Sequence, residues 1–176
     1  MKRFLFISLL LFSIRTPMLS YSQDNSKIDY SIIDKKLKQF AAIETNNGRN
    51  LDKISYDLIT IFLSLDTNDL MRWNIEDTIH NINMITTIIE HEVLLIKTGL
   101  AYIKSNDKSL FYENILKNKM EQYRKEIDSS LELLINRKYL VTDSVALHMI
   151  TMAEEISRNS VESHDKYIEF LRSIKF

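Results

Sequence analysis

The sequence predicts an all-α fold, an up-and-down helical bundle of four columns. The 176-residue chain contains only two glycines and one proline, Pro17, which is too few for the tight turns of a β-sandwich or barrel. Apolar residues recur at three- and four-residue spacing through most of the chain, and this spacing places them on one face of successive helices. The length favours a single domain, and the hydrophobic fraction of 45% and charged fraction of 27% are ordinary for a globular protein.

The longest of these patterns spans residues 69–104 and predicts a central helix. Asp66, Asn68 and Asp69 offer side-chain oxygens that can cap its N-terminus. The apolar face is too wide for one partner helix to cover, so the helix should pack against at least two neighbours. Its spacing is close to that of a coiled-coil seam. The face consists of Ile75, Ile79, Ile82, Thr86, Ile89, Val93, Ile96, Leu100 and Ile103.

Two shorter helices precede the central one, over residues 27–45 and 50–65. Between them, Asn46-Asn47-Gly48 is expected to end the first helix, because glycine suits the left-handed position after a helix end. Together the two helices match the length of the long ones. They are therefore interpreted as a first column broken into two shorter helices, with a hairpin of two separate helices as the alternative.

Two further long helices are expected after the central one. The first runs from Ser109, as its cap, to about Tyr139. The second is capped by Thr142 or Asp143 and runs almost to the end of the chain. Short connections between long helices favour antiparallel neighbours. These three long helices and the broken column complete the four-column bundle.

Residues 1–22 are predicted to be a secretory signal peptide. A basic start is followed by an apolar run over residues 4–14, which is too short to span a bilayer comfortably. Ser20 and Ser22 supply small side chains at the positions that a signal peptidase reads, so cleavage is expected before Gln23. The alternative is an uncleaved anchor or a buried first helix.

The mature chain, residues 23–176, is expected to form a single helical-bundle domain that is periplasmic or secreted. It has no second apolar run long enough to span a membrane, and no cysteine for a disulfide framework. The signal peptide removes three basic residues, so 20 Lys and Arg remain against 24 Asp and Glu. These charges are interspersed, and no basic block indicates nucleic-acid binding.

Motifs for enzymatic or metal chemistry are missing from the sequence. Asp77-x-x-His80 resembles half of a di-iron ligand set, but it lies on the polar back of its helix. His148, Met149 and Met152 could offer ligands to copper, although methionines at helical spacing are more typical of core packing. No nucleophile motif or phosphate loop is present. We therefore expect no cofactor, no metal and no catalytic residues.

Polar residues gather at one level of the predicted interior, where Glu92 interrupts the apolar flank of the central helix. A buried carboxylate needs partners or must neutralise by a shift of its pKa. One interpretation is a small-ligand or ion pocket. The alternative is a satisfied polar layer that fixes the register of the helices. Residues of the last two helices are expected at the same level, namely Gln122, Tyr123, Glu126, Asn159, Ser160, Ser163 and His164. The candidate pocket consists of Glu92, Tyr123, Asn159, Ser163 and His164.

Large aromatic residues are expected at both ends of the bundle. Trp73 and Tyr139 lie at one end, and Phe111 and Phe176 at the other. Aromatic groups at a surface commonly anchor protein partners. The alternative is that these side chains close the open ends of the bundle.

These observations predict an exported, non-enzymatic bundle that binds another protein. In size and plan the chain resembles periplasmic immunity proteins against cell-wall-degrading toxins, without a shared motif. That resemblance implies an inhibitory role toward a protein partner. A small-ligand sensor or carrier with a polar pocket around Glu92 is the alternative function, and the pattern is also compatible with a homodimer.

Overall fold

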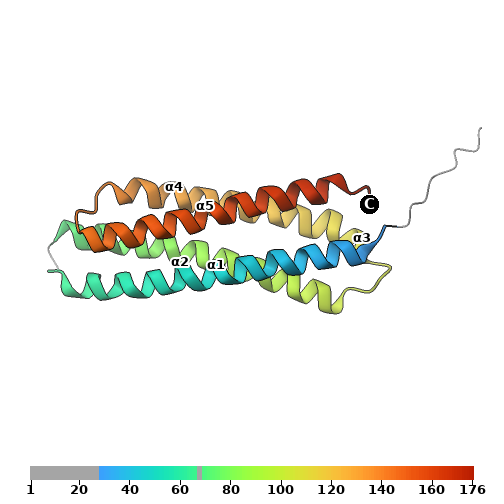
Figure 1. Cartoon of the computed structure of the whole chain (residues 1–176), viewed down its shortest axis with the longest axis horizontal. Helices are drawn as coiled ribbons and strands as arrows, with labels where there is room; N and C mark the ends of the chain where they lie inside the picture. Colours follow the sequence, from blue (N-terminus) through green and yellow to red (C-terminus); the bar gives the residue numbers. More distant parts are fainter. Residues whose placement is uncertain (1–27, 67–68) are drawn as a thin grey trace, which may run out of the picture.

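The computed structural model of the protein describes residues 28–66 and 69–176, so the predicted signal peptide lies outside the described residues. Within these ranges every regular element is helical and there is no strand, which confirms the all-α prediction. The helices form one elongated bundle (Figure 1). The elements are α1 (Tyr30–Ser64), α2 (Leu70–Tyr102), α3 (Lys108–Leu110), the π-helical η1 (Phe111–Lys117), α4 (Asn118–Lys138) and α5 (Ser144–Ser173).

The four columns follow an up-and-down order. α3, η1 and α4 succeed one another directly and together make the third column. α1 packs against α2 and α5, and α4 packs against the same two helices. The α1–α2 and α4–α5 connections lie at one end of the bundle, and the α2–α3 connection and the C-terminus lie at the other (Figure 1). Neighbouring columns are therefore antiparallel, as the short connections predicted.

The predicted break in the first column is wrong, because α1 is continuous from Tyr30 to Ser64. Gly48 is buried in the middle of this helix, and its φ is not positive. A glycine inside a helix costs about 1 kcal/mol relative to alanine. Burying one large apolar side chain gives roughly 1.5–3 kcal/mol. Phe40 and Leu51 are fully buried on either side of Gly48, so packing outweighs the weak helix propensity of this segment.

Aspartate side chains cap three of the long helices. Asp69 accepts a hydrogen bond from the backbone of α2, and Asp143 accepts two from the backbone of α5, as predicted. Asp29 does the same for α1. Ser109 is not a cap, because it lies inside α3, one residue after that helix begins. The third column thus begins slightly earlier than the sequence indicated.

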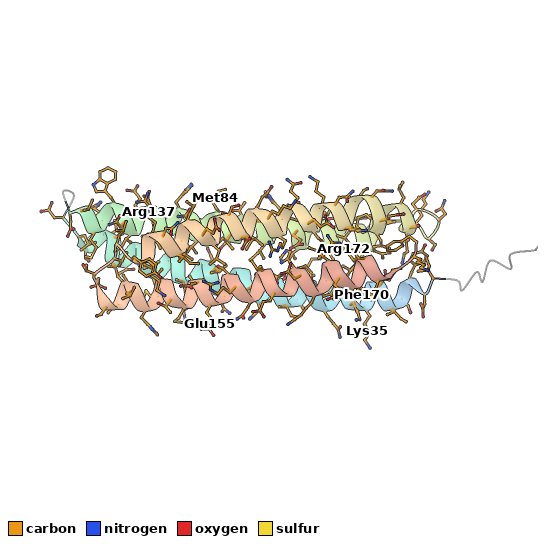
Figure 2. The ribbon with its side chains drawn as sticks, turned by 90° about the horizontal axis from the view of Figure 1, so that it is seen from above. Lys35, Met84, Arg137, Glu155, Phe170 and Arg172 are labelled. Carbon is orange, nitrogen blue, oxygen red and sulfur yellow. The ribbon has the colours of Figure 1, made fainter. Side chains whose placement is uncertain are left out.

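The core is built on the wide face of α2, with Ile75, Ile82, Ile89 and Ile96 almost completely shielded from solvent. Charged side chains line the outside of the bundle (Figure 2). None of the helices in the described ranges is both long enough and apolar enough to cross a membrane. The apolar face of α2 is thus covered by its neighbours, as the sequence predicted.

Candidate functional site

A cluster of titratable side chains lies in the middle of the bundle, and we call it the buried cluster. It comprises Glu44 of α1, Glu92 of α2, and Ser160 and His164 of α5, all without exposed surface. His164 Nε2 lies 2.7 Å from Glu92 Oε2, which joins α5 to α2 across the diagonal of the bundle. The Phe40 ring packs edge-on against the imidazole, with ring centroids 5.1 Å apart.

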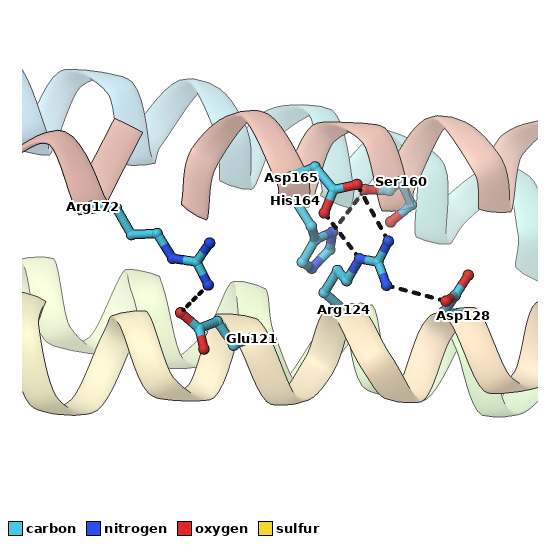
Figure 3. Close-up of polar contacts among 7 residues, drawn as sticks. All are labelled: Glu121, Arg124, Asp128, Ser160, His164, Asp165 and Arg172. Atoms are coloured by element: carbon cyan, nitrogen blue, oxygen red, sulfur yellow. Dashed lines mark hydrogen bonds and ion pairs between the residues drawn. The ribbon is translucent and has the colours of Figure 1, made fainter. Parts of the chain in front are cut away.

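The second nitrogen of His164 fixes the chemistry of this contact. Nδ1 lies 2.8 Å from the backbone oxygen of Ser160, one turn earlier on α5 (Figure 3). A carbonyl oxygen can only accept, so Nδ1 carries a hydrogen. Nε2 and the Glu92 carboxylate consequently share one proton, either as an ion pair or as a neutral acid and a neutral imidazole.

Glu44 extends the cluster to α1. The Ser160 hydroxyl lies 2.5 Å from Glu44 Oε2, and Asn47 Nδ2 donates to Glu44 Oε1 over 3.2 Å. Ser160 therefore connects the two buried glutamates. Its hydroxyl is bonded to Glu44, and its backbone oxygen is bonded to His164, which in turn contacts Glu92. Glu92 Oε1 is buried and has no hydrogen-bond partner among the described residues.

Burial raises the pKa of both glutamates. For Glu44 it outweighs the hydrogen bond from Ser160, and for Glu92 it outweighs the hydrogen bond to His164. Burial alone would lower the pKa of His164. The hydrogen bond to Glu92 and the negative charges of the two glutamates outweigh burial, so the pKa of His164 rises. The folded protein thus favours a protonated cluster.

The geometry of the cluster suits cohesion better than catalysis. With a hydrogen on Nδ1 alone, the imidazole is neutral and the two carboxylates carry two negative charges. Two further protons make the cluster electrically neutral, and a dry interior favours that state. Their side chains have no exposed surface, so a reactant could reach them only if the helices separated. Buried polar groups that can form their hydrogen bonds in only one arrangement of the helices fix the positions of those helices relative to one another.

The structure brings together only some of the residues predicted for this level. Glu92 and His164 meet directly. Ser163 is half-buried and lies close enough to Glu44 to lower its pKa in part. Tyr123 is half-buried on α4, and its pKa is raised by burial and by the charge of Glu92. Asn159 is exposed on the outside of α5, so its predicted place in the pocket is wrong.

Glu44 is the member of the cluster that sequence reasoning missed, because the first helix was expected to end near it. The apolar positions of the two predicted short helices nevertheless share one helical register. Continued through the supposed break, the stripe of Leu37, Ala41 and Leu51 includes Glu44 and Gly48. That continuity was the signal that could have identified both a single helix and a buried glutamate.

The α1–α2 and α4–α5 connections form an end of the bundle where apolar side chains face solvent, and we call it the exposed end. Its members are Leu70, Trp73, Tyr139 and Leu140, with 74%, 61%, 80% and 51% of their surfaces exposed. Asn74 Nδ2 donates to the Leu140 backbone oxygen over 3.3 Å, which holds α2 against the α4–α5 connection.

At the opposite end the predicted interface is wrong for Phe111. Phe111 is only 4% exposed, and its ring lies over Gly99 of α2, where there is no side chain. Phe176 is half-buried and stacks on Tyr112, with ring centroids 6.1 Å apart. The aromatic residues of this end close the bundle, which was the alternative interpretation.

The surface over the buried cluster is held by ion pairs between α4 and α5. Arg124 of α4 bonds to Asp165 of α5 at 2.9 Å, and Arg172 of α5 bonds to Glu121 of α4 at 3.0 Å (Figure 3). Within α4, Arg124 also bonds to Asp128 at 3.1 Å. In the described part of the chain, no group of three or more His, Cys, Asp or Glu side chains is arranged to hold a metal ion. Comparison with family models, with curated proteins and with solved structures gave no match.

Proposed function

We propose that this protein is an exported, non-enzymatic helical bundle that binds another protein through the exposed end. The observation that carries the proposal is the exposure of Trp73 in the first turn of α2 and of Tyr139 directly after α4. Tryptophan and tyrosine supply much of the binding energy in protein interfaces, since they bury a large area and have few rotatable bonds.

The surroundings of Trp73 fit this role. Asp77 lies one turn further along α2 and pairs with Arg137 of α4 at 2.8 Å. Arg72 donates to the Leu65 backbone oxygen at 2.8 Å and stacks on Phe62. These contacts link the end of α1 to α2 and α2 to α4 beside the exposed end, and such links favour a binding surface that is formed before the partner arrives. An apolar centre with charged groups beside it is typical of protein interfaces.

An immunity or inhibitor role in the periplasm is the most concrete form of the proposal. Such a protein needs a rigid surface that covers the active site of its target and needs no chemistry of its own. The lack of exposed surface on the buried cluster supports a non-enzymatic role. Export rests on the sequence of residues 1–22, and mass spectrometry of the protein from its native host should find a mature form starting near Gln23.

The binding proposal can be tested with the single tryptophan of the chain. Immobilised wild-type protein should retain a partner from a periplasmic extract of the host, and Trp73→Ala should lose it. Tyr102→Ala is the matched control, because Tyr102 is 82% exposed at the opposite end of α2. Neither substitution removes a buried group, so both variants should keep the wild-type melting temperature.

A captured partner is then purified and titrated against the wild-type protein. Trp73 is the only tryptophan, so its fluorescence emission should shift to shorter wavelength as the ring leaves water. Two results would show that the exposed end is not the binding surface. One is that Trp73→Ala retains the partner as well as Tyr102→Ala does. The other is that the partner binds without a shift in the emission wavelength of Trp73.

A further inference from the structure

A groove runs along the surface between α1 and α2, on the side of α1 away from the exposed end. One section, with a volume of about 290 Å³, has Gly48, Ile89 and Val93 among its lining residues, and Glu44 also borders it. A second section of about 380 Å³ is bordered by Ala41, Ile96 and Leu100, among others. Thr45, Arg49 and Lys97 line both sections, so the two sections lie next to each other. We call the whole the α1–α2 groove.

Charge is distributed unevenly along this groove. Lys38, Arg49 and Lys97 line the section near Leu100, and no carboxylate does. Asp52 and Glu90 line only the other section. In the described part of the chain none of the three cations pairs with a carboxylate, although exposed lysines and arginines elsewhere on the bundle do so. The cations of the groove are thus free to bind an added anion.

The floor of the groove passes over a glycine of α1, Gly48, and over the aliphatic side chains of Ile89 and Val93 of α2. A β-carbon on Gly48 would meet Ile89 Cγ2 at 3.4 Å, an ordinary contact, and φ at Gly48 is not positive. Neither the backbone nor the packing therefore requires glycine at this position, although glycine costs about 1 kcal/mol within a helix. Gly48 leaves this part of the groove lining, beside Ile89 and Val93, without a side chain from α1.

We infer that the α1–α2 groove binds an amphipathic anion, a single acyl carboxylate with its head at the cationic section and its chain over the apolar floor. Three cations without a carboxylate among them match an anionic head, and the aliphatic floor matches a hydrocarbon chain. From Lys38 to Asp52 a helix rises about 21 Å, which accommodates an extended acyl chain of medium length.

The carboxylates around the groove determine the orientation of this ligand. Asp52 and Glu90 would repel the head at the far section, so the head must lie near Lys38. Glu44 lies beneath the floor but is hydrogen-bonded to Ser160 and Asn47, and burial keeps its pKa raised. Glu44 is therefore less readily ionised than a glutamate at the surface would be. This site is separate from the exposed end and does not depend on the proposed protein partner.

Isothermal titration calorimetry with dodecanoate, kept below its micelle concentration, tests the inference on the purified protein. The wild type should bind one dodecanoate per chain, and the double variant Arg49→Gln/Lys97→Gln should bind it about five- to tenfold more weakly. Both residues are exposed and unpaired in the structure, so this variant should melt at the wild-type temperature.

Matched controls separate this site from general attraction to a charged surface or to an apolar one. Lys125→Gln/Lys166→Gln removes the same charge from exposed positions on α4 and α5 and should leave dodecanoate binding within about twofold of wild type. Dodecyltrimethylammonium has the same chain with a cationic head and should bind at least about tenfold more weakly than dodecanoate.

Three results would overturn the inference. The first is no heat of binding with dodecanoate. The second is equal loss of affinity in the groove variant and in the control variant. The third is binding to phosphatidylglycerol vesicles without binding to monomeric dodecanoate, which would make the cations a membrane contact. Each of these results leaves the protein-binding proposal unaffected, because that proposal is tested at Trp73.

Discussion

His164 Nε2 lies 2.7 Å from Glu92 Oε2, and both side chains are completely buried. Moving two ionisable groups out of water costs several kcal/mol for each, and their attraction returns this cost only when the geometry is good. Glu44 adds a third ionisable group that is bound to the same turn of α5 through Ser160. The stability of this bundle should therefore depend on proton binding in its centre.

The folded protein should be more stable at about pH 5 than at about pH 8. The pKa values of Glu44, Glu92 and His164 are all raised, from ordinary values of 4.5 for glutamate and 6.5 for histidine. A group whose pKa is higher in the folded protein than in the unfolded chain stabilises the fold fully at pH values below its unfolded-state pKa. This stabilisation is lost as the pH rises through its folded-state pKa. The loss should therefore begin above pH 4.5 and continue beyond 6.5.

Urea unfolding at a series of pH values measures this dependence. Each proton that is bound only in the folded state changes the free energy of unfolding by about 1.4 kcal/mol per pH unit. Glu44→Gln removes one of the three groups but keeps an amide that can bond to Ser160 and Asn47. The slope should be shallower in this variant. A flat wild-type profile between pH 5 and 8 would contradict the raised pKa values.

Removing one member of the buried Glu92–His164 pair should lower the free energy of unfolding much more than replacing both members. Among the described residues, His164 is the one hydrogen-bond partner of the Glu92 carboxylate, so His164→Ala should lower the free energy of unfolding by about 3–5 kcal/mol. Replacing the pair by His164→Leu with Glu92→Met removes both buried ionisable groups and keeps apolar volume. This double variant should be at least about 2 kcal/mol more stable than His164→Ala.

Thermal and urea unfolding of these two variants, followed by circular dichroism, measure the difference. His164→Leu alone is the control, since it shows how much apolar packing at position 164 contributes while Glu92 remains. If the double variant were as unstable as His164→Leu alone, the cost would come from packing at position 164. The Glu92–His164 contact would then have no part in it.

The periodicity of the sequence predicted the architecture well, because each long helix buries a continuous stripe. α2 begins after its predicted cap Asp69, and α5 begins after Asp143. Such features are local, since a cap and a stripe can be read from adjacent residues. The same helical periodicity predicts from the sequence that Glu92 and His164 lie at one level of the interior.

Contacts between helices account for the parts that the sequence did not predict. The weak helix formers at residues 46–48 favoured a helix end, yet burial on both sides keeps α1 continuous. Phe111 looked like a surface aromatic because the space it fills belongs to Gly99, twelve residues earlier on another helix. The stripe that continues through residues 44–48 could have indicated the single helix, whereas the contact of Phe111 with Gly99 is visible only in the packed structure.

The contact between Gly99 and Phe111 predicts that Gly99→Ala will destabilise the protein. An added methyl group would overlap the Phe111 ring, which is buried and cannot move aside freely. Overpacking of this kind costs roughly 1–3 kcal/mol, which exceeds the gain of about 1 kcal/mol in helix propensity. Urea unfolding should therefore give a lower free energy of unfolding than wild type. Adding Phe111→Leu to this variant should recover part of the loss, and no recovery would place the strain elsewhere.

Gly48→Ala should have the opposite effect on stability. Gly48 lies in the middle of α1, its φ is not positive, and the nearest atom to a new methyl group would be Ile89 Cγ2 at an ordinary 3.4 Å. The methyl group therefore fits, and better helix propensity should raise the free energy of unfolding by about 0.5–1 kcal/mol. The two substitutions make the same chemical change at the only two glycines of the chain, so each controls for the other. A loss of stability in Gly48→Ala would mean that α1 and α2 pack too closely there to admit a methyl group.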